Sequence, residues 1–188
     1  PTRLITSDNT GDLLAGKHAQ FGLYSNGMVP GYHVTRLLGE EMVPMASPEL
    51  AAALKADGSG SFRQFRRTDG PPFLNYLRSA PDWVDWRTWF DGLSIEGPEG
   101  WNVKTMSTYS QTIGEAIRGN GIALGSVALL QSELAAGRLM RLTGGVLRTD
   151  SGYYLCHAKS APLPDEAQRL ASFLIAAAHD QNASRDFP

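Results

Sequence analysis

The chain has 188 residues, 42% of them hydrophobic, which is enough apolar material for a buried core. Its 17 Lys and Arg against 19 Asp and Glu give a formal net charge of -2, without a basic run that could neutralise a row of DNA phosphates. The single cysteine, Cys156, excludes an internal disulfide and a multi-cysteine zinc site. We therefore expect a globular domain that does not bind DNA by itself and that belongs to a reducing compartment, the cytoplasm.

The first half of the chain is predicted to alternate short strands with helices and turns. Strands are expected at residues 3–6, 21–24, 41–46 and 73–77, and helices at residues 12–16 and 48–55. Residues 56–72 mix Gly, Ser, Asp and Arg, as in a surface loop. No segment resembles a signal peptide or has the roughly 18 apolar residues of a membrane span, so we expect a soluble protein with no membrane partner.

The second half continues the alternation. A helix capped by Asp82 is expected to carry Trp83, Trp86 and Phe90 on one face. Further strands are expected at residues 101–106, 122–125, 138–142 and 153–157, and further helices at residues 108–118, 127–136 and 164–179. In the last helix, four residues are expected to face inward: Ala167, Leu170, Leu174 and Ala177. The alternation indicates an α/β fold with largely parallel sheets, whose ligand sites lie at the carboxyl ends of strands.

Residues suited to catalysis or metal binding form no pattern in the sequence. There is no Gly-x-Ser-x-Gly elbow, and Cys156 lies in an apolar run typical of an inert core thiol. The carboxylate pairs Glu40-Glu41 and Asp165-Glu166 are explained by a solvated face or a helix N-terminus. The histidines have no metal-ligand spacing; they are His18, His33, His157 and His179. We expect no enzyme activity, no metal and no cofactor.

Hydroxyl groups gather at one predicted helix start. The run Ser107-Thr108-Tyr109-Ser110 places three hydroxyls and a phenol beside backbone N–H groups that a helix leaves without intrahelical partners. One cap needs only one hydroxyl, so both a ligand-binding role and a merely capping role stay open for Ser107 and Thr108. We interpret this run as a candidate site for a carboxylate or another anion.

Six groups of residues, in their order and spacing, resemble the effector-binding domain of LysR-type transcriptional regulators, in the subgroup of glycine-cleavage and β-lactamase regulators. These groups are Thr6-Ser7-Asp8 with Asp12-Leu13-Leu14-Ala15-Gly16; Asn26-Gly27 with Pro30-Gly31; Glu40-Glu41-Met42-Val43-Pro44 with Ser47-Pro48-Glu49-Leu50; Gly119-x-Gly121-Ile122-Ala123-Leu124-Gly125; Leu134-Ala135-Ala136-Gly137-Arg138-Leu139; and Tyr153-Tyr154-Leu155. The chain departs from the subgroup at Ala19, Leu23 and Val29, where the subgroup tends to have Asp, Arg and Trp. The family's first strand and helix are missing from this sequence.

The resemblance implies a two-lobed fold like that of type 2 periplasmic binding proteins, with two crossing hinge strands. Lobe I would comprise residues 1–38 and 157–188, and lobe II residues 39–156. A small-molecule effector would bind in the cleft between the lobes. The resemblance further implies a cytoplasmic regulator that forms a homodimer or homotetramer and binds DNA only through a helix-turn-helix domain absent from this sequence.

The residues that the resemblance implies for effector binding come from four places in the sequence. They are Ser7 and Asp8 in lobe I; Ala46 and Ser47 after the first strand of lobe II; Thr108, Tyr109 and Ser110 at the hydroxyl-rich helix start; and His157 at the second crossing. A free-standing solute-binding protein of the same fold is the alternative function. A domain that serves mainly oligomerisation, with a degenerate cleft, is a third hypothesis.

Overall fold

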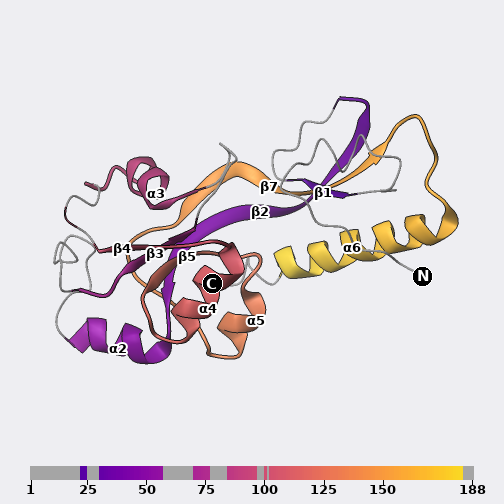
Figure 1. Ribbon diagram of the computed structural model, residues 1–188. Coiled ribbons are helices and arrows are strands. Elements are labelled where there is room, and N and C mark those ends of the chain that lie inside the picture. Colours follow the sequence, from indigo (N-terminus) through magenta and orange to yellow (C-terminus); the bar gives the residue numbers. More distant parts are fainter. Residues whose placement is uncertain are drawn as a thin grey trace. The chain divides into compact units, whose positions relative to one another are not determined.

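The computed structural model describes residues 22–24, 30–56, 70–76, 84–96, 100 and 102–183. The chain divides into two compact units, residues 1–40 with 149–188 (unit 1) and residues 41–148 (unit 2). Two long strands, β2 (Tyr32–Ala46) and β7 (Leu147–Ala158), each continue from one unit into the other (Figure 1). The expected α/β fold is confirmed, whereas the residue limits of the two lobes stay a prediction.

The sheet of unit 2 is mixed rather than largely parallel. Its parallel part consists of β5 (Ile122–Ser126), β3 (Phe73–Tyr76) and β4 (Val103–Met106), with β3 between the other two. In contrast, β2 lies antiparallel to β5, and the short β6 (Met140–Arg141) lies antiparallel to the end of β2. Parallel pairing needs crossover connections, and the segments containing helices α3 (Trp86–Gly92) and α4 (Tyr109–Ile117) supply them only between β3, β4 and β5.

Side chains of unit 2's strands fill two separate cores, because successive strand residues point to opposite faces of a sheet. On β5, Ile122 and Leu124 enter the core that contains residues of α2 (Pro48–Ala56) and α3. Ala123, between them, enters the core that contains residues of α4, with Leu134 of α5 (Gln131–Ala135) packed against it. The sheet of unit 2 is therefore covered on both faces.

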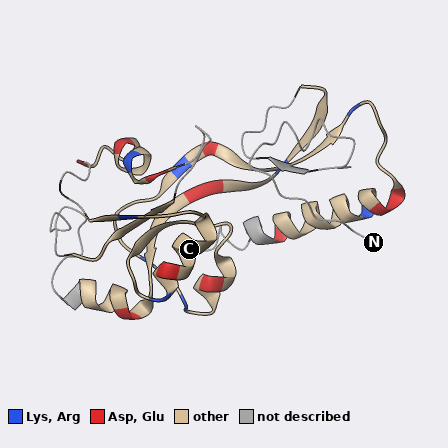
Figure 2. Cartoon of the chain, viewed as in Figure 1, with Lys and Arg blue, Asp and Glu red and all other residues tan. Residues whose placement is uncertain are grey.

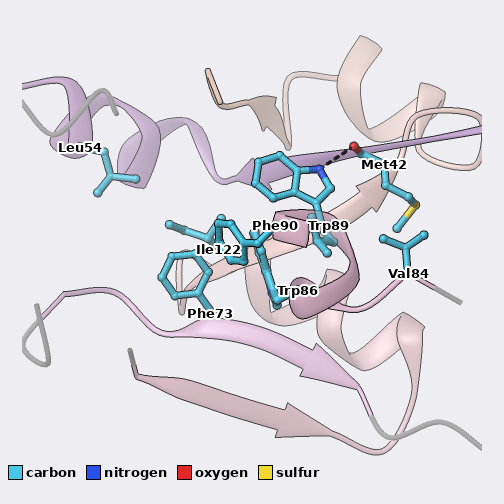
Figure 3. Close-up of a cluster of buried hydrophobic side chains, with 9 residues drawn as sticks. Met42, Leu54, Phe73, Val84, Trp86, Trp89, Phe90 and Ile122 are labelled. Atoms are coloured by element: carbon cyan, nitrogen blue, oxygen red, sulfur yellow. Dashed lines mark hydrogen bonds between the residues drawn. The ribbon is translucent and has the colours of Figure 1, made fainter. Parts of the chain in front are cut away.

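Aromatic side chains of α3 form the centre of the first core. Trp89 and Phe90 are fully buried, and Trp86 meets Phe73 edge-on with ring centroids 4.7 Å apart. Both indole N–H groups donate to strand carbonyls, Trp86 Nε1 to Leu74 and Trp89 Nε1 to Met42, each at 3.0 Å. Figure 3 shows the second of these bonds reaching from Trp89 to the β2 backbone. The rings therefore fix α3 to the sheet by packing and by hydrogen bonds.

Two helices of unit 2 differ from the sequence prediction at their starts. The N-cap of α3 is Asp85, whose Oδ1 accepts a 2.8 Å hydrogen bond from Thr88 N, whereas the expected cap, Asp82, lies outside the described residues. The helix expected at residues 127–136 forms only as α5. The residues before it make a turn in which the N–H groups of Leu129 and Leu130 both donate to the Ser126 carbonyl.

The described part of unit 1 contains a β-ribbon and one long helix. β1 (Gly22–Tyr24) lies antiparallel to β7, which neighbours β2, and both long strands extend further than the sequence indicated. The helix α6 (Asp165–Ala183) shares a core with Leu37 and Leu155 of the ribbon.

The inward face of α6 differs from the prediction in two positions. Ala167 is buried and Leu174 packs against the core of unit 1, as expected. Leu170 and Ala177 are exposed, and the following residues, Ala171 and Ala178, take the inward positions. The buried stripe thus follows helical spacing, but two of its positions are shifted by one residue. Within the described parts of the chain, no helix combines the length and hydropathy needed to cross a membrane.

Candidate functional site

The carboxyl ends of β3, β4 and β5 meet at one edge of unit 2's sheet, because these three strands are parallel. We call this the carboxyl edge. There β3 ends at Tyr76, β5 ends at Ser126, and β4 continues through Ser107 and Thr108 into α4 (Figure 1). The hydroxyl-rich run that the sequence singled out therefore lies where ligand sites of α/β folds occur.

Thr108 caps α4 at this edge. Its backbone is extended, with φ -138° and ψ 156°, and its Oγ1 accepts a 3.2 Å hydrogen bond from Gln111 N. One turn later, the buried Thr112 hydroxyl donates to the Thr108 carbonyl at 3.1 Å. The capping role of Thr108 is therefore confirmed. Ser107 and Ser110, on either side of it, are exposed at the same helix start.

Tyr109 joins the start of α4 to the end of β5. Its phenol oxygen accepts a 2.9 Å hydrogen bond from Ser126 N, and its ring packs edge-on against Tyr76 with centroids 5.5 Å apart. The Ser126 side chain is 2% exposed, and its Oγ has no hydrogen-bond partner within the described residues. Leaving a buried polar group without a partner costs about 1–3 kcal/mol. The carboxyl edge therefore contains a buried hydroxyl without a hydrogen-bond partner among the described residues.

Ser126 is not among the predicted site residues, because it follows an apolar run and looks like the last residue of a buried strand. Its burial and its unsatisfied hydroxyl both arise from tertiary packing. The one local signal was its place at the carboxyl end of a strand in an α/β chain.

Ala46 and Ser47, predicted to line the effector cleft, do not lie at the carboxyl edge, and their role in effector binding stays a prediction. They end β2, which runs antiparallel to β5, and they are 0% and 1% exposed. Ser47 Oγ accepts a 3.2 Å hydrogen bond from Leu50 N, and a methyl group added at Gly119 would lie 3.3 Å from that oxygen. Gly119 follows the C-terminus of α4, so the nine-residue helix, roughly 13 Å long, separates Ser47 from Thr108. In this structure Ser47 acts as a helix cap.

The remaining predicted effector contacts belong to unit 1. Ser7 and Asp8 lie outside the described residues. His157 lies on β7, where its ring is 4.9 Å from that of His33, and its Nδ1 is buried without a hydrogen-bond partner among the described residues. The roles of these three residues in effector binding stay predictions.

Three glutamates of the described chain, Glu40, Glu41 and Glu115, form ion pairs or hydrogen bonds. Glu40 is buried, in contrast to the solvated face expected for it, and accepts a 3.0 Å hydrogen bond from Thr149 Oγ1. Its neighbour Glu41 pairs with Arg148 at 2.8 Å. Beyond the carboxyl edge, at the other end of α4, hydrogen bonds from Arg118 and then Asn120 lower the pKa of Glu115. Glu115 is therefore ionised at neutral pH, which does not suit a general acid.

Cys156 should be unreactive in the native protein. Its side chain is 0% exposed, and burial raises the pKa of its thiol, so little of the reactive thiolate exists at neutral pH. We expect the aromatic disulfide DTNB to label native Cys156 at least about tenfold more slowly than the urea-unfolded chain. Native labelling as fast as that of the unfolded chain would show an accessible, activated thiol and contradict this assignment.

Comparisons with known proteins agree on one family. The LysR substrate binding domain family matches residues 5–179. The glycine cleavage system transcriptional activator of Escherichia coli K12 is 28% identical over 184 residues, which cover 97% of this chain and 57% of that protein. This chain therefore spans little more than half the length of that relative.

Solved structures show the same fold. The effector domain of the transcriptional regulator AmpR of Pseudomonas aeruginosa superposes with a TM-score of 0.70 at 21% identity, covering 97% of this chain and 83% of that one. Full-length LysG from Corynebacterium glutamicum, with bound effector Arg, gives a TM-score of 0.58 at 23% identity, covering 94% of this chain and 57% of that one. These likenesses establish the effector-domain fold and leave the ligand of this chain to chemical argument.

Proposed function

Because this chain belongs to the LysR substrate binding domain family, we propose that it binds a small-molecule effector and that a longer regulator uses this binding to control transcription. The relatedness to the glycine cleavage system transcriptional activator supports regulation as the function of the longer protein. An effector that binds one conformation more tightly than another would shift the population between them. The longer regulator would respond to this change in the population of the two conformations.

The buried, unsatisfied hydroxyl of Ser126 carries the assignment of the site. Ser126 ends β5 at the carboxyl edge, where its backbone N–H donates to the phenol of Tyr109 at the start of α4, and its side chain belongs to the face of β5 that carries Ile122 and Leu124. The first backbone N–H groups of a helix attract anionic groups, and the exposed hydroxyl of Ser110 can add a hydrogen bond. We therefore assign to the carboxyl edge a small ligand with a carboxylate or another hydrogen-bonding anion.

A thermal-shift screen tests this function directly. Amino acids come first, since LysG was solved with bound effector Arg and the Escherichia coli relative is an activator of the glycine cleavage system. Small organic acids, aromatic acids and cell-wall fragments follow. A ligand that binds only the folded chain raises its melting temperature in proportion to the logarithm of concentration. A folded chain whose Tm does not change with any of these compounds would contradict the proposal.

Ser126→Ala should separate ligand binding from stability. Removing an unsatisfied buried hydroxyl is expected to leave the ligand-free chain equally stable or slightly more stable. Losing one hydrogen bond to the effector should weaken its affinity about three- to tenfold. Isothermal titration calorimetry with the effector found in the screen measures this change.

Ser132→Ala, an exposed serine on α5 in the same unit, is the matched control and should leave affinity unchanged. Thr108→Ala is a poorer test because losing the cap alone costs about 1 kcal/mol. Unchanged affinity in both Ser126→Ala and Ser110→Ala would show that the effector does not bind at the carboxyl edge.

The same assignment makes this chain a binding domain without enzyme activity, acting in the cytoplasm as part of a homodimer or homotetramer. DNA would be bound by a helix-turn-helix domain elsewhere in the longer protein. Acidic and basic residues are interspersed over the described elements rather than gathered in a basic strip (Figure 2). The relatives named above are regulators or their effector domains, which gives no support to a free-standing solute-binding protein.

A further inference from the structure

His33 and His157 form a cross-strand pair in the ribbon of unit 1. The N–H of Lys159, just after β7, donates to the carbonyl of Gly31, just before β2, at 2.9 Å. Gly31 and Lys159 are therefore opposed residues of two antiparallel strands. Two residues further along each strand, His33 of β2 faces His157 of β7. Opposed residues of antiparallel strands place their side chains on the same face, with Cβ atoms about 4.5–5.5 Å apart. The ring centroids are 4.9 Å apart.

This ring separation is what two imidazoles sharing one metal ion would have. A zinc–nitrogen bond is about 2.1 Å long and the ring centre lies about 1 Å beyond the nitrogen, so two ligands at a tetrahedral ion have centroids about 5 Å apart. The observed 4.9 Å matches this value. The spacing of the two rings therefore allows both imidazoles to bind one ion.

One nitrogen of the pair lacks a partner. His157 Nδ1 is buried and has no hydrogen-bond partner among the described residues. A buried polar atom in that state is costly, and a metal ion would satisfy it. The His33 ring is exposed, so an ion can approach the pair from solvent.

We propose that His33 and His157 form a two-histidine site for a divalent transition-metal ion of the Zn²⁺ or Cu²⁺ type. Neutral imidazole suits these ions and not Mg²⁺ or Ca²⁺, which prefer oxygen ligands. The described residues contain no cluster of three or more His, Cys, Asp or Glu, so among them these two imidazoles would be the protein ligands. The proposal concerns unit 1 and stands independently of the effector site at the carboxyl edge.

Isothermal titration of the chain, free of any purification tag, with ZnCl₂ and CuCl₂ tests the site. One ion per chain is expected, and MgCl₂ should give no heat of binding. Mutating a residue that only hydrogen-bonds to a metal ligand typically weakens metal affinity about 10–100-fold. Removing a direct ligand in His33→Ala should therefore raise the Kd for the metal at least about tenfold. His179→Ala, which removes an exposed histidine of α6, is the matched control and should leave the Kd unchanged.

A second measurement tests the ligand set itself. The electron paramagnetic resonance spectrum of the Cu²⁺-loaded chain should show splitting from two nitrogens, reduced to one in His33→Ala. Because His33 is exposed, this variant should fold like the unchanged chain, as circular dichroism can verify. Absence of Zn²⁺ and Cu²⁺ binding, or binding that His33→Ala leaves as tight as before, would overturn the proposal.

No metal site is predicted from the sequence, because the histidines have no metal-ligand spacing along the chain. His33 and His157 are distant in sequence, and only the pairing of β2 with β7 brings their rings together. A two-residue site of this kind leaves no motif in a linear sequence.

Discussion

Replacing Trp89 with alanine is expected to destabilise the chain by about 3–5 kcal/mol. Trp89 is fully buried and packs against the rings of Trp86 and Phe90, with centroids 5.8 Å and 5.1 Å away. The substitution leaves a cavity between α3 and the sheet. It also removes the indole N–H that donates a hydrogen bond to the Met42 carbonyl. Urea unfolding followed by far-ultraviolet circular dichroism measures the loss, since tryptophan fluorescence would itself change.

Two further variants identify the cause of that loss. Trp89→Phe keeps an aromatic ring but removes the indole N–H, so it should cost less than Trp89→Ala and more than a surface change. Phe173→Ala removes a large side chain that is 65% exposed and should shift stability by no more than about 0.5 kcal/mol. If Trp89→Ala cost no more than Phe173→Ala, the aromatic cluster would not be the core of unit 2.

Local signals in the sequence predicted most elements of unit 2. The Thr108 cap and the Gly119-Asn120-Gly121 stop define α4, and the apolar run after them is β5. The direction of strand pairing could not be predicted in the same way. The antiparallel partners β2 and β5 are far apart in the sequence, with β3 and β4 lying between them in the chain. Pairing between distant segments depends on the packing of the entire unit.

The candidate site shows the same division between local and tertiary information. The hydroxyls of Thr108 and Ser110 were predicted because a helix start can be recognised in the sequence. Ser47 resembles them locally, since it also follows a strand and caps a helix. Its strand, however, is antiparallel to β5, so Ser47 lies at the opposite edge of the sheet. Ser126 stayed hidden because lacking a hydrogen-bond partner is a property of the fold.

Gly121→Ala is expected to be the other strongly destabilising change, at about 2–6 kcal/mol. Gly121 has φ +154°, and a Cβ there would lie 2.4 Å from the Pro72 carbonyl oxygen and 2.8 Å from Leu74 Cγ. That carbonyl accepts the 2.9 Å hydrogen bond from Ile122 N with which β5 begins its pairing to β3. Relief of the clash would therefore displace β5 itself, and with it Ser126 at its other end. Urea unfolding and the effector titration should both respond.

Gly137→Ala separates the clash from the backbone conformation. Gly137 also has positive φ, at +67°, but a Cβ there would meet no atom within 4 Å. Its substitution should therefore cost only the left-handed conformation, about 1–2 kcal/mol, and leave effector binding intact. Equal losses for Gly121→Ala and Gly137→Ala would mean that the approach of Pro72 is not what requires glycine at position 121. A larger loss for Gly121→Ala, together with a weakened effector response, would show that the start of β5 determines the position of the carboxyl edge.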